Sequence, residues 1–174
     1  DSFPPIMDGV ALAVYNYAYH LQKKQENVVV VTPESTQNSD NEIFEMMRYA
    51  SLPLVKRKPY RLGVPYIDLE FMWKLYRKKD FKIIHAHSPF SSGRLALMTA
   101  KRRNIPFIVT FHSKFKDDFQ RIVKSEKIAN LMVKKVMTVF DHADEVWIPQ
   151  ASVEDTIREY GYRGNVEVVN NGSD

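Results

Sequence analysis

The sequence predicts an α/β fold in which helices cover both faces of an open, doubly wound and mostly parallel sheet. Apolar runs of strand length alternate with segments of helical periodicity from residue 81 to residue 169. The run 28–31 is entirely β-branched, which suits a strand buried on both faces. Parallel neighbours need crossover connections, and helices in those crossovers cover the sheet. A chain of 174 residues, 44% of them apolar, has the size and composition of one compact domain.

The first half of the chain contains two clear elements and an ambiguous region. Apolar residues at helical spacing predict a helix over residues 8–25 that begins at Gly9. A strand is expected at 28–31. Residues 43–58 stay ambiguous, and 60–65 form a short strand or a loop. The amphipathic helix expected next has its apolar residues at Ile67, Leu69, Phe71, Met72, Leu75 and Tyr76.

The second half alternates regularly between strands and helices. Strands are expected over 81–87, 105–111, 145–148 and 165–169, and helices over 90–103, 117–141 and 152–160. Ser152 is the expected N-cap of the last helix. The last strand is apolar enough to predict burial on both faces. The long helix is expected to bury Ile128, Leu131, Met132, Val136, Val139 and Phe140.

Composition narrows the classes of function. The chain has no cysteine, so it lacks disulfides and a thiolate nucleophile, and a reducing, cytoplasmic location is expected. No apolar run reaches the roughly 18 residues of a membrane span. The net charge of +4 comes mostly from clusters such as 56–58, 74–79 and 101–103. These clusters suit solvated helix ends or anionic lipid head groups. They lack the interleaved aromatics of a nucleic-acid surface, so no nucleic-acid partner is expected.

Residues 1–174 are expected to form a single domain, because no linker or repeat interrupts them. At 170–174 the pair Asn171-Gly172 suits an abrupt change of chain direction, since both residue types reach positive φ cheaply. We expect a hinge to a second domain there. Gly9 should follow a first strand, yet two prolines precede it and forbid a central strand. A buried strand upstream of the first residue is therefore expected in the intact gene product.

The candidate site consists of residues that follow strands, because ligands of doubly wound sheets bind beyond the carboxyl ends of the strands. These residues, which we expect to converge on one rim, are Asp8, Gly9, His87, Ser88, Pro89, Phe90, His112, Ser113, Lys114, Pro149 and Gln150. A glycine that opens a helix lets a phosphate approach the positive end of the helix dipole. Neither a dinucleotide fingerprint nor a phosphate loop of the triphosphatase kind occurs, so no such cofactor is expected.

Three histidines are expected to lie near one another. His85 and His87 are two residues apart on a strand and therefore share a face, while His112 ends a neighbouring strand. Three imidazoles can ligate zinc, so a metal-dependent hydrolase is one alternative, although no zinc-protease spacing supports it. His85, in mid-strand, fits a hydrogen-bonded core histidine. His112, at the rim, can exchange a proton with a substrate hydroxyl near neutral pH.

Five motifs follow one another along nearly the whole chain. They are Phe3-Pro4-Pro5 with Asp8-Gly9-Val10, IHAHSPF at 84–90, Ile105-Pro106 leading into VTFHS at 109–113, ADEV at 143–146, and Asn170-Asn171-Gly172. Together they resemble the N-terminal half of the retaining glycosyltransferases of glycosyltransferase family four. The resemblance implies two facing Rossmann-like domains, the N-terminal one binding mainly the acceptor and the C-terminal one the nucleotide-sugar donor. It also implies a reaction without a metal or other cofactor.

By position, the resemblance implies that His112 lies beside the reacting sugar as the catalytic residue and that Gly9 lies in the loop approaching the donor diphosphate. The donor-binding half is absent from this sequence, so the chain alone is expected to be inactive. The resemblance is closest to bacterial members that glycosylate diacylglycerol lipids, which would place the basic clusters at an anionic membrane. A non-catalytic module that binds a phosphorylated sugar or a lipid head group stays open as an alternative.

Overall fold

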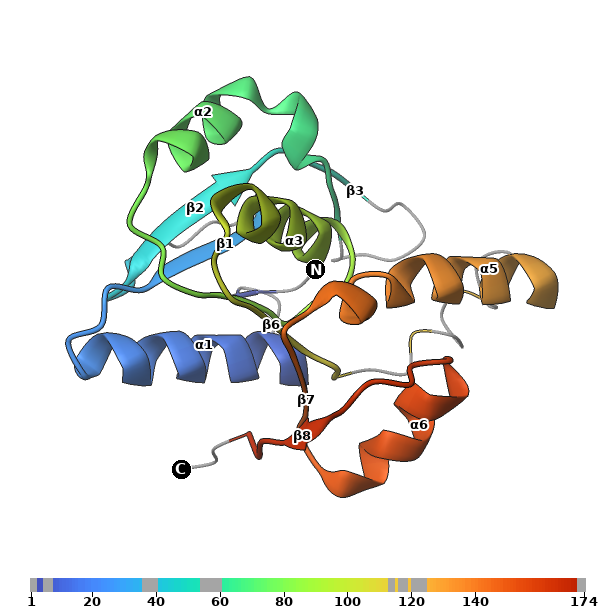
Figure 1. Cartoon of the computed structure of the whole chain (residues 1–174). Coiled ribbons are helices and arrows are strands. Elements are labelled where there is room, and N and C mark those ends of the chain that lie inside the picture. Colours follow the sequence, from blue (N-terminus) through green and yellow to red (C-terminus); the bar gives the residue numbers. More distant parts are fainter. Residues whose placement is uncertain are drawn as a thin grey trace. The chain divides into compact units, whose positions relative to one another are not determined.

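The chain contains two compact units that both combine helices with parallel strands. The computed structural model describes residues 3–4, 8–35, 41–53, 61–112, 115, 119 and 125–171. One unit is formed by the described residues up to Phe81, and the other is Lys82–Asn171. Figure 1 shows their elements. Parallel pairing in both units confirms the predicted α/β class, whereas the single-domain organisation stays a prediction.

The first unit pairs its strands two by two. Its elements are α1 (Gly9–Lys23), β1 (Val29–Pro33), β2 (Glu45–Tyr49), β3 (Ser51–Pro53), β4 (Arg61–Gly63), the 3-10 helix η2 (Pro65–Ile67) and α2 (Leu69–Arg77). β1 and β2 are parallel and lie side by side in Figure 1, whereas β3 and β4 are antiparallel. Phe3, Ala18, Val30 and Phe44 form a buried apolar cluster, in which the two phenylalanine rings meet edge to face. The predicted helix and β-branched strand are thus confirmed to within two residues at each end.

β2 lies in the segment that the sequence left ambiguous. After the exposed Glu45, half-buried and buried residues alternate along it, with Met47 buried and Tyr49 fully buried. Glu45 and Arg48 interrupt the apolar pattern, so the strand carries no continuous apolar run.

α2 buries a narrower face than its sequence predicts. Phe71 and Leu75, four residues apart, are buried. Leu69 and Tyr76, expected on the same apolar face, are exposed, and Ile67 lies in the preceding 3-10 helix and is exposed as well. The prediction for these three residues was wrong because the helix carries two apolar stripes and only one of them reaches the core.

The second unit contains a four-stranded parallel sheet in the order β5-β6-β7-β8. Its elements are β5 (Ile84–Ala86), α3 (Ser91–Arg103), β6 (Phe107–Thr110), α5 (Glu126–Met137), η3 (Phe140–His142), β7 (Glu145–Ile148), η4 (Ala151–Val153), α6 (Glu154–Glu159) and β8 (Glu167–Val168). All four residues of β6 are buried, as expected of a strand covered on both faces. Strands that alternate with helices around a parallel sheet give the Rossmann-like arrangement.

Three expectations for the second unit were wrong. Of the six residues expected to be buried by the long helix, Val136, Val139 and Phe140 are buried and Met132 is partly buried, but Ile128 and Leu131 are exposed; α5 instead buries Ala129, Val133 and Met137. Ser152 lies inside the 3-10 helix η4, and α6 begins without a side-chain cap. Both residues of β8 are exposed, because this strand forms the edge of the sheet and has a neighbour only in β7. The long helix predicted over 117–141 begins in a segment that lies mostly outside the described residues.

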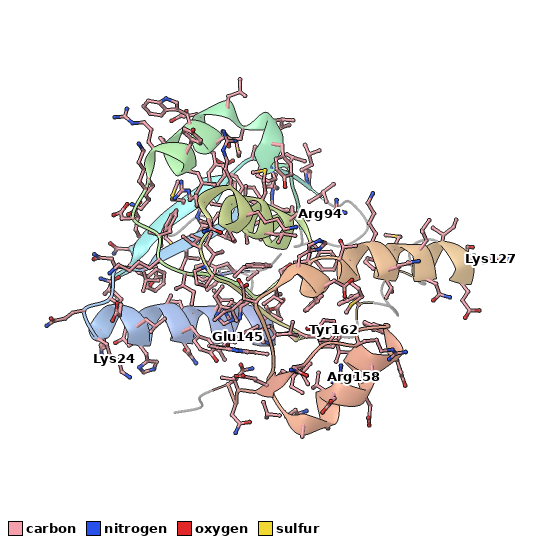
Figure 2. All side chains as sticks on the ribbon, viewed as in Figure 1. Lys24, Arg94, Lys127, Glu145, Arg158 and Tyr162 are labelled. Atoms are coloured by element: carbon pink, nitrogen blue, oxygen red, sulfur yellow. The ribbon has the colours of Figure 1, made fainter. Side chains whose placement is uncertain are left out.

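The turn after α6 is held by one arginine. The Arg158 guanidinium donates hydrogen bonds to the carbonyl oxygens of Tyr162 at 3.3 Å and of Gly164 at 2.6 Å, and Figure 2 labels Arg158 and Tyr162. It also pairs with Glu154 at 2.9 Å, one turn earlier on the helix. These contacts fix the path by which the chain leaves α6 and returns to the sheet as β8.

Candidate functional site

Two histidines from β5 and one from the end of β6 lie together in the second unit. His85 is in the middle of β5, and His87 follows its last residue. Their ring centroids are 4.0 Å apart, as expected of residues that share one face of a strand. His112 follows β6, which pairs with β5 in parallel. Its Nε2 lies 2.9 Å from Nδ1 of His87, within hydrogen-bond distance.

His85 is a hydrogen-bonded core histidine, as the sequence predicted. Its Nε2 lies 2.7 Å from the hydroxyl of Thr110, a buried residue at the end of β6. The indole of Trp147 meets the His85 ring edge to face at a centroid distance of 4.9 Å. Trp147 donates its own ring N–H to the carboxylate of Glu145, labelled in Figure 2, at 2.8 Å. The imidazole of His85 is thus held from two neighbouring strands.

Burial keeps the inner histidines neutral. It lowers the pKa of His85 to about 4, and the neighbouring His112 adds to the effect. The pKa of His87 also lies well below its ordinary value, first because of burial and then because of repulsion from His85 and His112. At neutral pH both rings therefore carry one proton each. A neutral imidazole has one donor and one acceptor nitrogen, so each ring can join a chain of N–H···N or O–H···N hydrogen bonds.

Thr110 and Trp147 belong to this histidine cluster but were not among the predicted site residues. Both lie on strands whose existence the sequence predicted, and they are direct partners in the register of β6 and β7. The sequence did contain a signal for them, because each is a polar or amphipathic residue near the carboxyl end of a predicted strand. The apolar pattern alone does not give the register that brings them to His85.

The turn between β5 and α3 holds Ser88 close to the helix. A side-chain carbon at Gly93 would overlap the carbonyl oxygen of Ser88, so only glycine allows this approach. The hydroxyl of Ser88 accepts a hydrogen bond from the N–H of Phe90 at 3.5 Å. Ser88 thus follows directly on His87 in a turn whose backbone is packed against α3.

Asp8 and Gly9 lie in the first unit, and their expected convergence with His112 stays a prediction. The Asp8 carboxylate caps α1 by accepting a hydrogen bond from the N–H of Ala11 at 2.8 Å. Gly9 is the first residue of the helix and is exposed. A side-chain carbon there would meet no atom within 4 Å, so packing does not require glycine at this position.

Three of the predicted residues lie outside the described part of the chain. They are Ser113, Lys114 and Gly172. Asn171, the other residue of the expected hinge, is the last described residue and is exposed. The roles assigned to these four residues stay predictions.

The histidines do not form a metal site. Among the described residues, no group of three or more His, Cys, Asp or Glu side chains is arranged to hold a metal ion. The nitrogens of His87 and His112 bond to each other, and His85 bonds to Thr110. This arrangement does not support the metallohydrolase alternative.

Comparisons with known proteins agree with the motifs. The model of Glycosyltransferase Family 4 matches residues 7–174. An alpha-monoglucosyldiacylglycerol synthase of Streptococcus pneumoniae is 27% identical over 173 residues, which are 99% of this chain and 39% of that protein. A protein of the same name from Acholeplasma laidlawii is 28% identical over 119 residues, covering 67% of this chain and 29% of the relative. The chain thus spans about two fifths of the length of the longer-matching relative. Since the family model covers nearly all of it, the chain belongs to glycosyltransferase family 4.

Proposed function

We propose that the chain is the N-terminal, acceptor-binding domain of a retaining glycosyltransferase. The whole enzyme transfers a sugar from a nucleotide-sugar donor to an acceptor hydroxyl. The proposal is carried by the family match over residues 7–174, combined with an alignment that leaves more than half of the streptococcal relative for a second domain. That second domain binds most of the donor, and the pair Asn171-Gly172 is the hinge between the two.

His112 is the proposed catalytic residue, placed beside the reacting carbon where it polarises or positions the substrates. His87, Ser88, Ser113 and Lys114 are proposed to bind the donor diphosphate or the acceptor close to it. The proposed site is supported by the His87–His112 contact at 2.9 Å and by the packed turn at Ser88. We propose no metal or cofactor for the reaction.

Asp8 and Gly9 are proposed to meet the substrates at the N-terminus of α1. The open space over Gly9 lets a ligand approach the backbone there. The Asp8 carboxylate repels a phosphate at the same helix end, so we assign it to hydroxyl groups of the sugar or acceptor. A diphosphate is then expected to approach from the side of Gly9.

A donor and acceptor screen on the full-length protein tests this function. We expect nucleotide release that depends on both a nucleotide sugar and a lipid acceptor, with diacylglycerol and glucosyldiacylglycerol as the first acceptors tried because both relatives are named for such lipids. The 174-residue chain alone is expected to release no nucleotide, because the proposed second domain binds most of the donor. Turnover by the chain alone, or no turnover by the full-length protein with any donor, would contradict the proposal.

We propose that an anionic membrane surface is a partner of the first unit, as a cytoplasmic and peripheral contact. Leu69, Trp73 and Tyr76 lie four and three residues apart on α2 and therefore share one stripe. They are 80%, 57% and 57% exposed. Within the described residues, no helix is both long and apolar enough to cross a membrane. A surface stripe that contains Trp and Tyr suits the level of the lipid head groups.

The charge around this stripe also favours anionic lipid. From residue 61 to residue 82 the chain has six Lys or Arg and three Asp or Glu. The Arg77 guanidinium lies over the Trp73 ring at 4.6 Å, so a cation accompanies the exposed indole. Basic residues near the membrane surface gain about 1 kcal/mol each from anionic lipid.

Vesicle sedimentation with the full-length protein tests this contact. Changing both Leu69 and Trp73 to glutamate is expected to weaken binding to phosphatidylglycerol-containing vesicles by about a hundredfold, because two apolar side chains lose their insertion energy. Leu131→Glu, on α5, is the matched control, since Leu131 is as exposed as these residues but lies in the other unit. Equal losses in the two variants, or wild-type binding as tight to phosphatidylcholine alone, would contradict the contact.

A further inference from the structure

We infer that His87 is a positioning residue that holds the His112 ring through Nε2 and couples the tautomer of His112 to its own. This inference rests on the proposed function of His112. It goes beyond that function because it assigns the tautomer and orientation of His112 to a residue on another strand. The bond between Nδ1 of His87 and Nε2 of His112, at 2.9 Å, carries the inference.

A distance of 2.9 Å between two ring nitrogens requires one proton between them. If His87 donates, His112 carries its proton on Nδ1. If His112 donates, its Nδ1 is an acceptor. In either case Nε2 of His112 is engaged by His87.

His87 is well supported for such a role. It follows β5, whose Ala86 pairs with Val109 of β6, so the strands that carry the two histidines are in fixed register. The ring of His85 lies against His87, and His85 is itself bonded to Thr110. Directly after His87, the turn that contains Ser88 packs against Gly93 of α3. His112 itself lies two residues after the end of β6.

The pair accepts one added proton and not two. If both facing nitrogens carried hydrogen, two N–H groups would point at each other across the same 2.9 Å. Burial and the neighbouring His85 disfavour the charge on His87. With one added proton on His112, its Nε2–H donates to His87 and the two facing nitrogens still share a single hydrogen. His87 acts on the reaction through His112 and needs no contact with the reacting atoms in this role.

Nitrogen NMR of the ¹⁵N-labelled full-length protein at about pH 7.5 tests the bond without any assay of activity. We expect a coupling through the hydrogen bond between Nδ1 of His87 and Nε2 of His112, and shifts of a single tautomer for His112. The absence of this coupling together with tautomer-averaged His112 shifts would overturn the inference. This measurement decides the inference even if the proposed glycosyl transfer proves wrong.

Two variants separate hydrogen bonding from packing. His87→Asn places an amide group near the position of Nδ1, whereas His87→Leu has similar bulk and no hydrogen-bonding group. We expect a single His112 tautomer in the asparagine variant and mixed tautomers in the leucine variant. His142→Leu is the control, because His142 is exposed and bonds the Thr138 carbonyl through its Nδ1. It should leave His112 unchanged.

The same variants give a kinetic readout in an active full-length enzyme. His87→Leu is expected to lower kcat about tenfold with little change in KM for the acceptor, because a mispositioned catalytic group affects the transition state more than binding. His87→Asn should recover most of the loss. Equal kcat and equal His112 spectra in the two variants would overturn the inference.

Discussion

Replacing His112 with alanine is expected to lower kcat of the full-length enzyme by at least about a hundredfold, the usual contribution of a positioned acid, base or polarising group. The expected loss is large because His112 is the proposed catalytic histidine of the cluster, whereas His85 is committed to Thr110 and His87 bonds His112. Because the proposed contact strengthens in the transition state, kcat and kcat/KM should fall together. The measurement is nucleotide release at saturating donor and acceptor.

His142→Ala is the matched control for this experiment. His142 lies in the same unit, is exposed, and bonds only locally to the carbonyl oxygen of Thr138 among the contacts described here. It should retain wild-type kcat, and the circular dichroism of both variants should match the wild type. A His112→Ala enzyme with kcat within about threefold of wild type would remove His112 from the catalytic role, because such a change is below 1 kcal/mol.

Acidification from about pH 6.5 to pH 4 is expected to lower the free energy of unfolding by about 3 kcal/mol through His85 alone. In the folded state the pKa of His85 is about 4, so the ring stays neutral over most of this range. In the unfolded chain the same ring takes up a proton near its ordinary pKa. The unfolded state thus binds more protons as the pH falls, and stability is lost. His87, whose pKa is also lowered, acts in the same direction.

Urea unfolding followed by far-ultraviolet circular dichroism over this pH range measures the effect. Carboxylates also titrate in the lower part of the range, so the informative quantity is the difference between variants. His85→Gln keeps an amide group near the position of Nε2 and cannot titrate. Its stability should therefore depend less on pH than that of the wild type, while His142→Gln should behave as wild type. An unchanged pH dependence in His85→Gln would show that the half-buried His85 ring is not the source.

The sequence predicted best those elements with continuous apolar runs and clear ends. β7 matches the expected strand 145–148 at both ends, with Asp144 before it and Pro149 after it. α3 ends as expected at Arg103, and Asn104 follows in the left-handed conformation that commonly ends a helix. In these segments local preference and burial agree, so pattern alone is sufficient.

Helix faces and the edge strand were harder to predict, because periodicity gives stripes without saying which stripe meets the core. In α5 the small Ala129 marks the buried side, while the larger Ile128 and Leu131 face outward. β8 reads as a buried strand but lies at the edge of the sheet. Neither outcome can be read from apolarity, because each depends on which neighbours the tertiary structure supplies.

The candidate site was predicted in part. Strand alternation correctly placed His85 and His87 on one face. The parallel pairing of β5 with β6 brought His112 to them. The bond of His85 to Thr110 and the packing of Trp147 depend on strand register and side-chain rotamers, which no pattern in the chain specifies.

Because of their placement, the two tryptophans can report on the two units through their intrinsic fluorescence. The chain has two of them, and each lies in a different unit. Trp73 is exposed on α2, so its emission colour should respond to the polarity of whatever approaches that helix. Trp147 touches the His85 ring, so its emission should respond to changes at that imidazole. If either tryptophan is replaced by phenylalanine, the fluorescence of the remaining tryptophan would report on its own unit without an added label.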